Sequence, residues 1–159
     1  MKSTRKIKWV NSVEGIYKDC PTKVDLKNVG GYYYEPTNTI YLIRKKSDAT
    51  DKYHEIHHSI HHHSEHPRSP MEYAMRETSA DVYAYKKTGK PAHRLAGLIA
   101  RYNALVKDEY NENPTNTLRY IKRALKKTGA PETWMKDYEE LVRRVQKVQN
   151  KLKHQPKKT

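Results

Sequence analysis

The sequence predicts an α+β fold, in which a small, mostly antiparallel sheet packs on a helix pair and three further helices follow. Strand-forming Tyr and Ile, with turn residues between them, are concentrated before residue 45. From Ser47 on, long segments without internal Pro begin at capping residues or at Pro. The 159 residues suit one domain, so we expect a single domain over 1–159. Within it, 1–90 would hold the sheet and the helix pair, 91–153 a basic helical extension and 154–159 a frayed tail.

The strands are predicted in the N-terminal third of the chain. Two of them are the segments IKWV (7–10) and VEGIYK (13–18). A hairpin is predicted from GGYYYE and TIYLI around the turn Pro36-Thr37-Asn38, with Gly30-Gly31 supplying turn chemistry on the other side.

Five helices are predicted from capping signals. The first starts after Ser47 and runs without Gly or Pro until Pro67. The second has a capping-box pattern at Ser69-Pro70-Met71-Glu72 and ends near Gly89. The other three are expected at about 92–107, 114–127 and 131–152, each with Pro near its start. The last carries an apolar seam that favours an intramolecular core over a dimer zipper, made by Trp134, Tyr138, Leu141, Val145, Val148 and Leu152.

Composition narrows the classes of protein that this chain can represent. No apolar run approaches the roughly 20 residues needed to cross a bilayer, and the N-terminus lacks the apolar stretch of a signal peptide. The single Cys20 cannot form an internal disulfide, which agrees with a reducing compartment. We therefore expect a cytoplasmic protein without a membrane partner, and its oligomeric state is left open.

The net charge of +14 is unevenly distributed along the chain. Residues 86–159 contain 19 Lys and Arg against 7 Asp and Glu, whereas residues 1–85 contain 13 against 11. A basic field attracts phosphate backbones or acidic partners, although a solvated Lys-rich surface has the same composition.

The segment with candidate metal-binding and catalytic residues is His54-Glu55-Ile56-His57-His58, an H-E-x-x-H pattern. On a helix, His54 and His58 lie one turn apart on the same face, with Glu55 beside them. Two imidazoles and one further ligand suit zinc and leave the fourth position to water, which a neighbouring carboxylate can deprotonate. We therefore expect one Zn²⁺ per chain, with Glu55 as the general base.

The abundance of histidine leaves other interpretations open. Seven of the nine His lie between residues 54 and 66, and the pairs His57/His61, His58/His62 and His62/His66 repeat the same spacing. Only His54/His58 has Glu directly after the first His. A histidine cluster that buffers metal ions would show the same enrichment.

The next predicted helix offers the third ligand. Glu77 and Asp81 lie one turn apart, with Ala80 and Ala84 close by to allow tight helix packing. An antiparallel helix pair joined by a short turn at Glu65–Ser69 would bring this face against the two histidines. Without a metal, Glu77 and Asp81 would be an ordinary pair of surface acids.

The order of the hairpin, the helix YHEIHHSIHH and the helix containing E-x-x-A-D-x-Y-A resembles the ImmA/IrrE family of zinc metallopeptidases over roughly residues 20–90. The resemblance implies His54, His58 and Glu77 as zinc ligands and Glu55 as the catalytic base. His61 falls at the position of an extra family His. The chain departs from the family pattern at His57, Asp81 and Tyr83, where Gly, Asn and Phe are usual, and it lacks the L-L-M-P-like stretch that follows.

These features predict hydrolysis of a peptide bond in a protein or peptide substrate. The resemblance implies one specific substrate protein, such as a repressor-like regulator of a mobile element or stress response. We expect Asp81 to orient a ligand His from outside the coordination shell, with His61 as a further candidate for such a role. The strand Thr39–Ile43 is expected to align an extended substrate by strand addition. The candidates for stabilising the oxyanion are Tyr34, Tyr73 and His61.

A nucleic-acid-binding protein with a structural or vestigial metal site is the alternative. Residues 117–145 could form a helix–turn–helix through Thr128-Gly129-Ala130-Pro131. DNA or an acidic partner would then meet the cations of its first helix, which are Arg119, Lys122, Arg123, Lys126 and Lys127.

Overall fold

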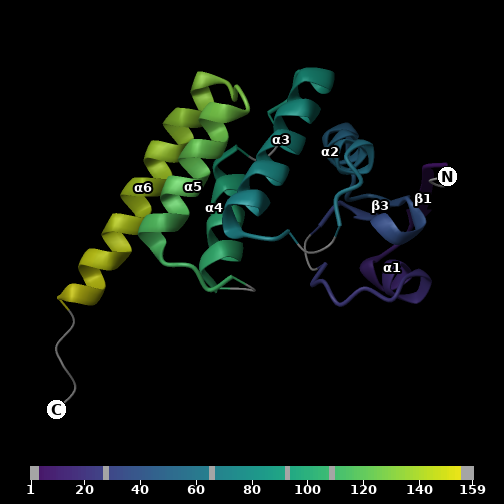
Figure 1. Ribbon diagram of the computed structural model, residues 1–159, viewed down its shortest axis with the longest axis horizontal. Helices are drawn as coiled ribbons and strands as arrows, with labels where there is room; N and C mark the ends of the chain where they lie inside the picture. Colours follow the sequence, from purple (N-terminus) through teal and green to yellow (C-terminus); the bar gives the residue numbers. More distant parts are fainter. Residues whose placement is uncertain (1–3, 27–28, 65–66, 92–93, 108–109, 155–159) are drawn as a thin grey trace, which may run out of the picture. The chain divides into compact units, whose positions relative to one another are not determined.

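The computed structural model describes residues 4–26, 29–64, 67–91, 94–107 and 110–154. The fold is α+β, as predicted. The elements, in chain order, are β1 (Lys6–Val10), α1 (Val13–Asp19), β2 (Gly31–Tyr34), the 3₁₀ turn η1 (Glu35–Thr37), β3 (Thr39–Ile43), α2 (Ala49–Ile60), α3 (Pro70–Thr88), α4 (Arg94–Lys107), α5 (Pro114–Lys127) and α6 (Glu132–Lys153) (Figure 1).

The chain divides into two compact units. The first contains residues 1–68 and 76–92, and the second contains residues 69–75 and 93–159. Helix α3 therefore belongs to both, with its first turns in the second unit. Each unit is described by itself.

The three strands of the first unit form a mixed sheet in the order β1-β3-β2. The predicted hairpin is confirmed, because β2 and β3 pair antiparallel with Gly31 opposite Leu42 and Tyr34 opposite Thr39. The prediction of a mostly antiparallel sheet is wrong, because β1 runs parallel to β3. β1 ends beside Ile43 and β2 begins beside Leu42, so α1 and the segment after it start and finish at the same end of the sheet. The antiparallel β2 then returns the chain to the start of β3.

The central position of β3 also overturns the proposed role of Thr39–Ile43 in substrate alignment. β1 pairs with all five of its residues on one side, and β2 pairs with it on the other. Because both backbone edges are already used, an added strand cannot pair with β3.

The segment Val13–Asp19 is a helix, so the prediction of a strand there was wrong. Its buried residue is Ile16, and Val13, Ile16 and Cys20 contribute to one apolar cluster. Their spacing of three and then four residues is helical, whereas the prediction weighed only the strand propensity of Ile and Tyr.

Side chains of β3 alternate between two apolar clusters. Tyr41 and Ile43 pack with Ile16 of α1 on one face, and Ile40 and Leu42 pack with Ile56 of α2 on the other. The sheet is thus covered on both faces, and α2 is held against it by Ile56.

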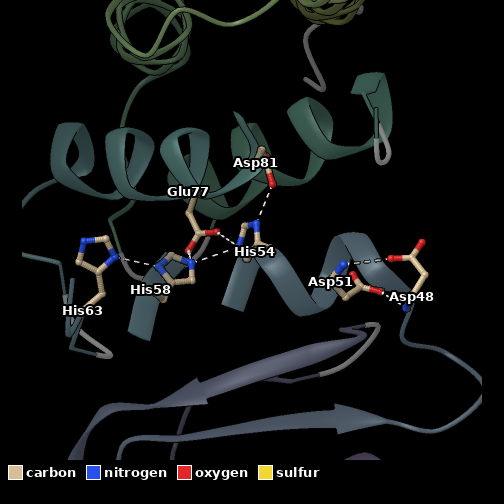
Figure 2. A network of polar contacts seen from close by, with 7 residues as sticks. All are labelled: Asp48, Asp51, His54, His58, His63, Glu77 and Asp81. Carbon is tan, nitrogen blue, oxygen red and sulfur yellow. Dashed lines mark hydrogen bonds and ion pairs between the residues drawn. The ribbon is translucent and has the colours of Figure 1, made fainter. Parts of the chain in front are cut away.

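Both helices of the predicted pair start at their predicted caps. The carboxylate of Asp48 accepts from the backbone N–H of Asp51, and the carboxylate of Asp51 accepts from that of Asp48, each at 3.0 Å (Figure 2). The hydroxyl of Ser69 accepts from the N–H of Glu72 at 3.1 Å. The predicted connection Glu65–Ser69 includes residues 65 and 66, which lie outside the described ranges. Residues 92 and 93 of the third predicted helix and residues 155–159 of the predicted tail also lie outside them.

Gly30 lies in a bend directly before β2, and both Gly30 and Gly31 allow close packing. A Cβ on Gly30 would lie 2.5 Å from a carboxylate oxygen of Asp51, and a Cβ on Gly31 would lie 3.1 Å from Cγ of Glu55. Asp51 and Glu55 are one turn apart on α2, so the two glycines let that side of the helix approach β2.

Helices α4, α5 and α6 lie side by side in the second unit (Figure 1). The hydroxyl of Tyr138 donates to the carbonyl of Leu118 at 3.1 Å. Leu118 lies about two turns before the connection between α5 and α6, and Tyr138 lies about two turns after it. Because these positions are in contact, the two helices form an antiparallel hairpin. A helix–turn–helix crosses its helices at about 90–120°, so that prediction for 117–145 is wrong.

The predicted seam of α6 is buried only in its first part. Trp134, Tyr138, Leu141 and Val145 are buried, whereas Val148 and Leu152 are 58% and 62% exposed. α6 has 22 residues and α5 has 14, so the last two turns of α6 extend past their antiparallel neighbour. Among the residues that the structure describes, no helix is long and apolar enough to cross a membrane.

Candidate metal centre

Helix α2 presents a different chemistry on each of its sides. Ile56 faces the sheet, while His54 and His58, two positions before and after it, point toward α3 (Figure 2). Two residues correspond to about 200° around a helix, so burying Ile56 turns both imidazoles away from the sheet. Glu77 and Asp81 of α3 point back toward them (Figure 2).

Three donor atoms converge between α2 and α3. Nε2 of His54 lies 3.0 Å from Oε2 of Glu77 and 3.1 Å from Nε2 of His58, which lies 3.4 Å from Oε1 of Glu77. Zinc binds His nitrogen and carboxylate oxygen at about 2.0–2.2 Å, which places tetrahedral ligand atoms about 3.4 Å apart. Within the described part of the chain, this is the one group of three or more His, Cys, Asp or Glu that could hold a metal ion.

Each imidazole has a second partner on its other nitrogen. Nδ1 of His54 lies 2.7 Å from Oδ1 of Asp81, and Nδ1 of His58 lies 2.8 Å from Nδ1 of His63. A carboxylate only accepts, so Nδ1 of His54 carries a proton and donates it to Asp81. If Nε2 of His58 binds a metal, its Nδ1 must likewise donate, and the acceptor is His63. Both contacts hold Nε2 toward the shared position.

The charges of the cluster are strongly coupled. Burial by itself would lower the pKa of His54, but the carboxylates of Asp81 and Glu77 outweigh it and raise the pKa well above its usual value. Burial would raise the pKa of Glu77, but His58 and His54 lower it well below its usual range. Glu77 is therefore a carboxylate at neutral pH, and a metal ion bound to Nε2 of His54 would displace a proton.

Glu55 stands beside this cluster, on the side of α2 that meets β2. Burial raises the pKa of its carboxyl, while the positive fields of His54 and His58 act in the opposite direction. Its Cγ lies against Gly31, the first residue of β2. The carboxyl group is thus adjacent to the ligand set without belonging to it.

The rings of His57, His61 and His63 stack beside this cluster. The rings of His57 and His61 have centroids 4.5 Å apart, and His61 stacks on His63 at 5.4 Å. His57 also packs against Tyr83. His61, a predicted candidate for orienting a ligand histidine, thus contacts His57 and His63, whereas the contact with Nδ1 of His58 is made by His63.

Two of the candidates for oxyanion stabilisation, Tyr34 and His61, make their described contacts away from this cluster. Tyr34 packs with the apolar cluster on the α1 face of the sheet, and His61 makes its ring contacts with His57 and His63. Tyr73 belongs to the second unit, where its ring lies 5.7 Å from that of Tyr110.

His63 is the residue that sequence reasoning missed. Helix α2 ends at Ile60, and His62 takes a left-handed conformation with φ of 48°. The N–H of His63 then donates to the carbonyl of His58, and that of His62 to the carbonyl of Ser59. This Schellman motif usually has Gly where His62 stands, so no glycine in the sequence marks it.

Comparisons with models of protein families, with curated proteins and with solved structures found no match to this chain. The resemblance to the ImmA/IrrE family therefore stays a prediction. What the structure establishes is a cluster of His54, His58 and Glu77 that could hold a metal ion.

Proposed function

We propose that this protein is a zinc-dependent peptidase. The observation that supports it most is the convergence of Nε2 of His54, Nε2 of His58 and the carboxylate of Glu77 at separations of 3.0 to 3.4 Å. Two imidazoles and a carboxylate are a donor set that zinc uses in catalytic sites, where the fourth position stays open.

Glu55 is the proposed general base. Bound zinc would supply acidity to a water molecule and polarise a carbonyl group. The Glu55 carboxylate would accept the proton of that water and later deliver it to the leaving amine.

The outer edge of β2 is the proposed guide for an extended substrate. No described strand pairs with that edge, and Gly31 at its start lies against Glu55. A backbone that added to β2 would therefore pass beside the base, with its amides aligned by main-chain hydrogen bonds.

Metal content tests the site itself. Protein washed free of loosely held ions should retain about one zinc per chain, and His54→Ala, His58→Ala and Glu77→Ala should each empty the site. His57→Ala is the matched control, because His57 lies on the same helix but contacts Tyr83 and His61. Several ions per chain, lost in parallel with whichever histidine is removed, would support the metal buffer instead.

Catalysis is tested by Glu55→Gln. The amide keeps the size of the side chain but cannot accept the proton, so zinc should be retained while cleavage falls by about 10⁴-fold, the upper end for general-base loss. Cleavage can be followed by mass spectrometry on a peptide library made from the native host's proteome. Glu14→Gln makes the same chemical change on the exposed side of α1 and should cleave normally. Equal cleavage by the Glu55→Gln variant would rule out the mechanism.

A further inference from the structure

Helix α5 is amphipathic, and five of its six exposed residues are basic. Its buried residues are Thr117, Ile121, Ala124 and Leu125. Its five cations are all exposed, and their spacing of three, four, seven and eight residues from the first puts them on one side of the helix. We call this surface the α5 basic face, made of Arg119, Lys122, Arg123, Lys126 and Lys127.

No described acid neutralises the α5 basic face. The helix PTNTLRYIKRALKK contains no Asp or Glu, and none of its five cations makes an ion pair with a described residue. The neighbouring α6 is different, since Glu140 pairs there with Arg143 and Arg144 at 2.7 and 3.3 Å. Five unpaired cations on one helix side repel one another and raise the free energy of the isolated fold.

We propose that the α5 basic face binds the phosphate backbone of a double-stranded nucleic acid. Residues 119 to 127 extend along the helix by about 12 Å. Over that length a duplex carries about seven phosphates, one per roughly 1.7 Å of axis. The five cations thus match a duplex in charge density, and this binding is independent of the proposed peptidase activity.

The chemistry of the face disfavours the other polyanions. Insertion into an anionic membrane needs exposed apolar or aromatic side chains, and no large hydrophobic residue of α5 is exposed. A protein interface would need an apolar or aromatic centre, which the face lacks for the same reason. Single-stranded nucleic acids are held by stacking on aromatic rings, and the basic face contains none. A face made only of Lys and Arg contacts the phosphates of the backbone, so binding should not depend on base sequence.

Fluorescence anisotropy of a labelled 20-base-pair duplex, measured at several salt concentrations, tests the proposal. The logarithm of affinity should fall linearly with the logarithm of salt concentration, with a slope of about −4.5 if all five cations contact phosphates. The triple variant K122Q/K126Q/K127Q should reduce the magnitude of the slope by about 2.7 and weaken binding at low salt by at least tenfold. The charge-preserving variant K122R/K126R/K127R should bind like the parent protein.

The matched control removes three exposed lysines from the first unit, in K18Q/K23Q/K46Q. It makes the same change in net charge, so it should leave the slope unaltered if the α5 basic face is the site. A slope that falls equally in both triple variants would overturn the proposal, since binding would then follow net charge alone. Displacement of the duplex by polyglutamate or by phosphatidylserine vesicles at equal charge concentration would overturn it in favour of an acidic protein or a membrane.

Discussion

Nδ1 of His63 lies 2.8 Å from Nδ1 of His58, and the turn that ends helix α2 creates this contact. In a Schellman motif, the second residue past the cap commonly packs against a residue one turn back in the helix. Here those two positions are His63 and His58, so a helix terminus supplies the outer hydrogen bond of a candidate metal ligand. Burial lowers the pKa of His63 to about 4, so its ring is neutral at pH 7 and can accept that hydrogen bond.

Replacing His63 should therefore weaken metal binding. His63→Phe keeps a ring to stack on His61 but removes the acceptor nitrogen, and loss of an outer partner typically costs 10- to 100-fold in metal affinity. Competition with a zinc chelator would measure the change. His62→Gly is the control, because glycine adopts the left-handed conformation of residue 62 readily and keeps the turn. Unchanged affinity in the His63→Phe variant would show that the contact does not orient His58.

Gly31→Ala should reduce cleavage without emptying the metal site. The new Cβ would lie 3.1 Å from Cγ of Glu55, 3.2 Å from Cδ2 of Leu42 and 3.3 Å from the carbonyl oxygen of Tyr41, so the side chains of Glu55 and Leu42 must both give way. The neighbours need to shift by only a few tenths of an ångström. A displacement of about 1 Å at a catalytic group can cost on the order of 100-fold in rate, so the loss expected here is smaller than that. Zinc content and cleavage rate would be measured together.

The double variant Gly31→Ala/Glu55→Gln separates this effect from a general loss of stability. If Gly31 acts through Glu55, its replacement should change little once the base is already absent. Equal rate losses in both backgrounds would contradict that interpretation.

Two leucines of α6 should differ sharply in their effect on stability. Leu141 is 2% exposed, whereas Leu152 is 62% exposed beyond the end of α5. Leu141→Ala should lower the free energy of unfolding by about 2–5 kcal/mol, and Leu152→Ala should change it by less than about 0.5 kcal/mol. Urea denaturation of the two variants would check this. A comparable loss at Leu152 would mean that the end of α6 is covered in solution.

The carboxylate of Asp19 should make the first unit sensitive to acid. It accepts hydrogen bonds from Nζ of Lys8 at 2.8 Å and from the hydroxyl of Tyr41 at 2.6 Å, and both contacts lower its pKa. A carboxyl whose pKa is lower in the folded state stabilises the protein above its unfolded pKa of about 3.9 and loses that contribution at lower pH.

Asp19→Asn should therefore lower the melting temperature at pH 7, and the difference from the parent protein should close as the pH falls toward 2–3. Thermal unfolding followed by circular dichroism at both pH values would show it. A difference that persists unchanged at pH 2 would mean that the charge of Asp19 contributes nothing.

Local sequence patterns were enough to predict the α+β class, the hairpin and the helices from Ala49 onward. Capping residues such as Ser69, Pro at helix starts and helical spacing act within a few residues, so they are readable without knowledge of the fold. The same holds for His54 and His58, whose spacing alone puts them on one side of a helix. The error at Val13–Asp19 arose because propensity was given more weight than the spacing of Val13, Ile16 and Cys20.

Contacts between distant segments needed the folded chain. The direction of β1 relative to β3 depends on how the chain crosses between them, which no local pattern encodes. The packing of Glu55 against Gly31 and the contact of His63 with His58 depend on where α2 lies on the sheet and how it ends. Periodicity specifies which side of a helix a residue occupies, whereas burial of Ile56 against Ile40 and Leu42 determines what that side faces.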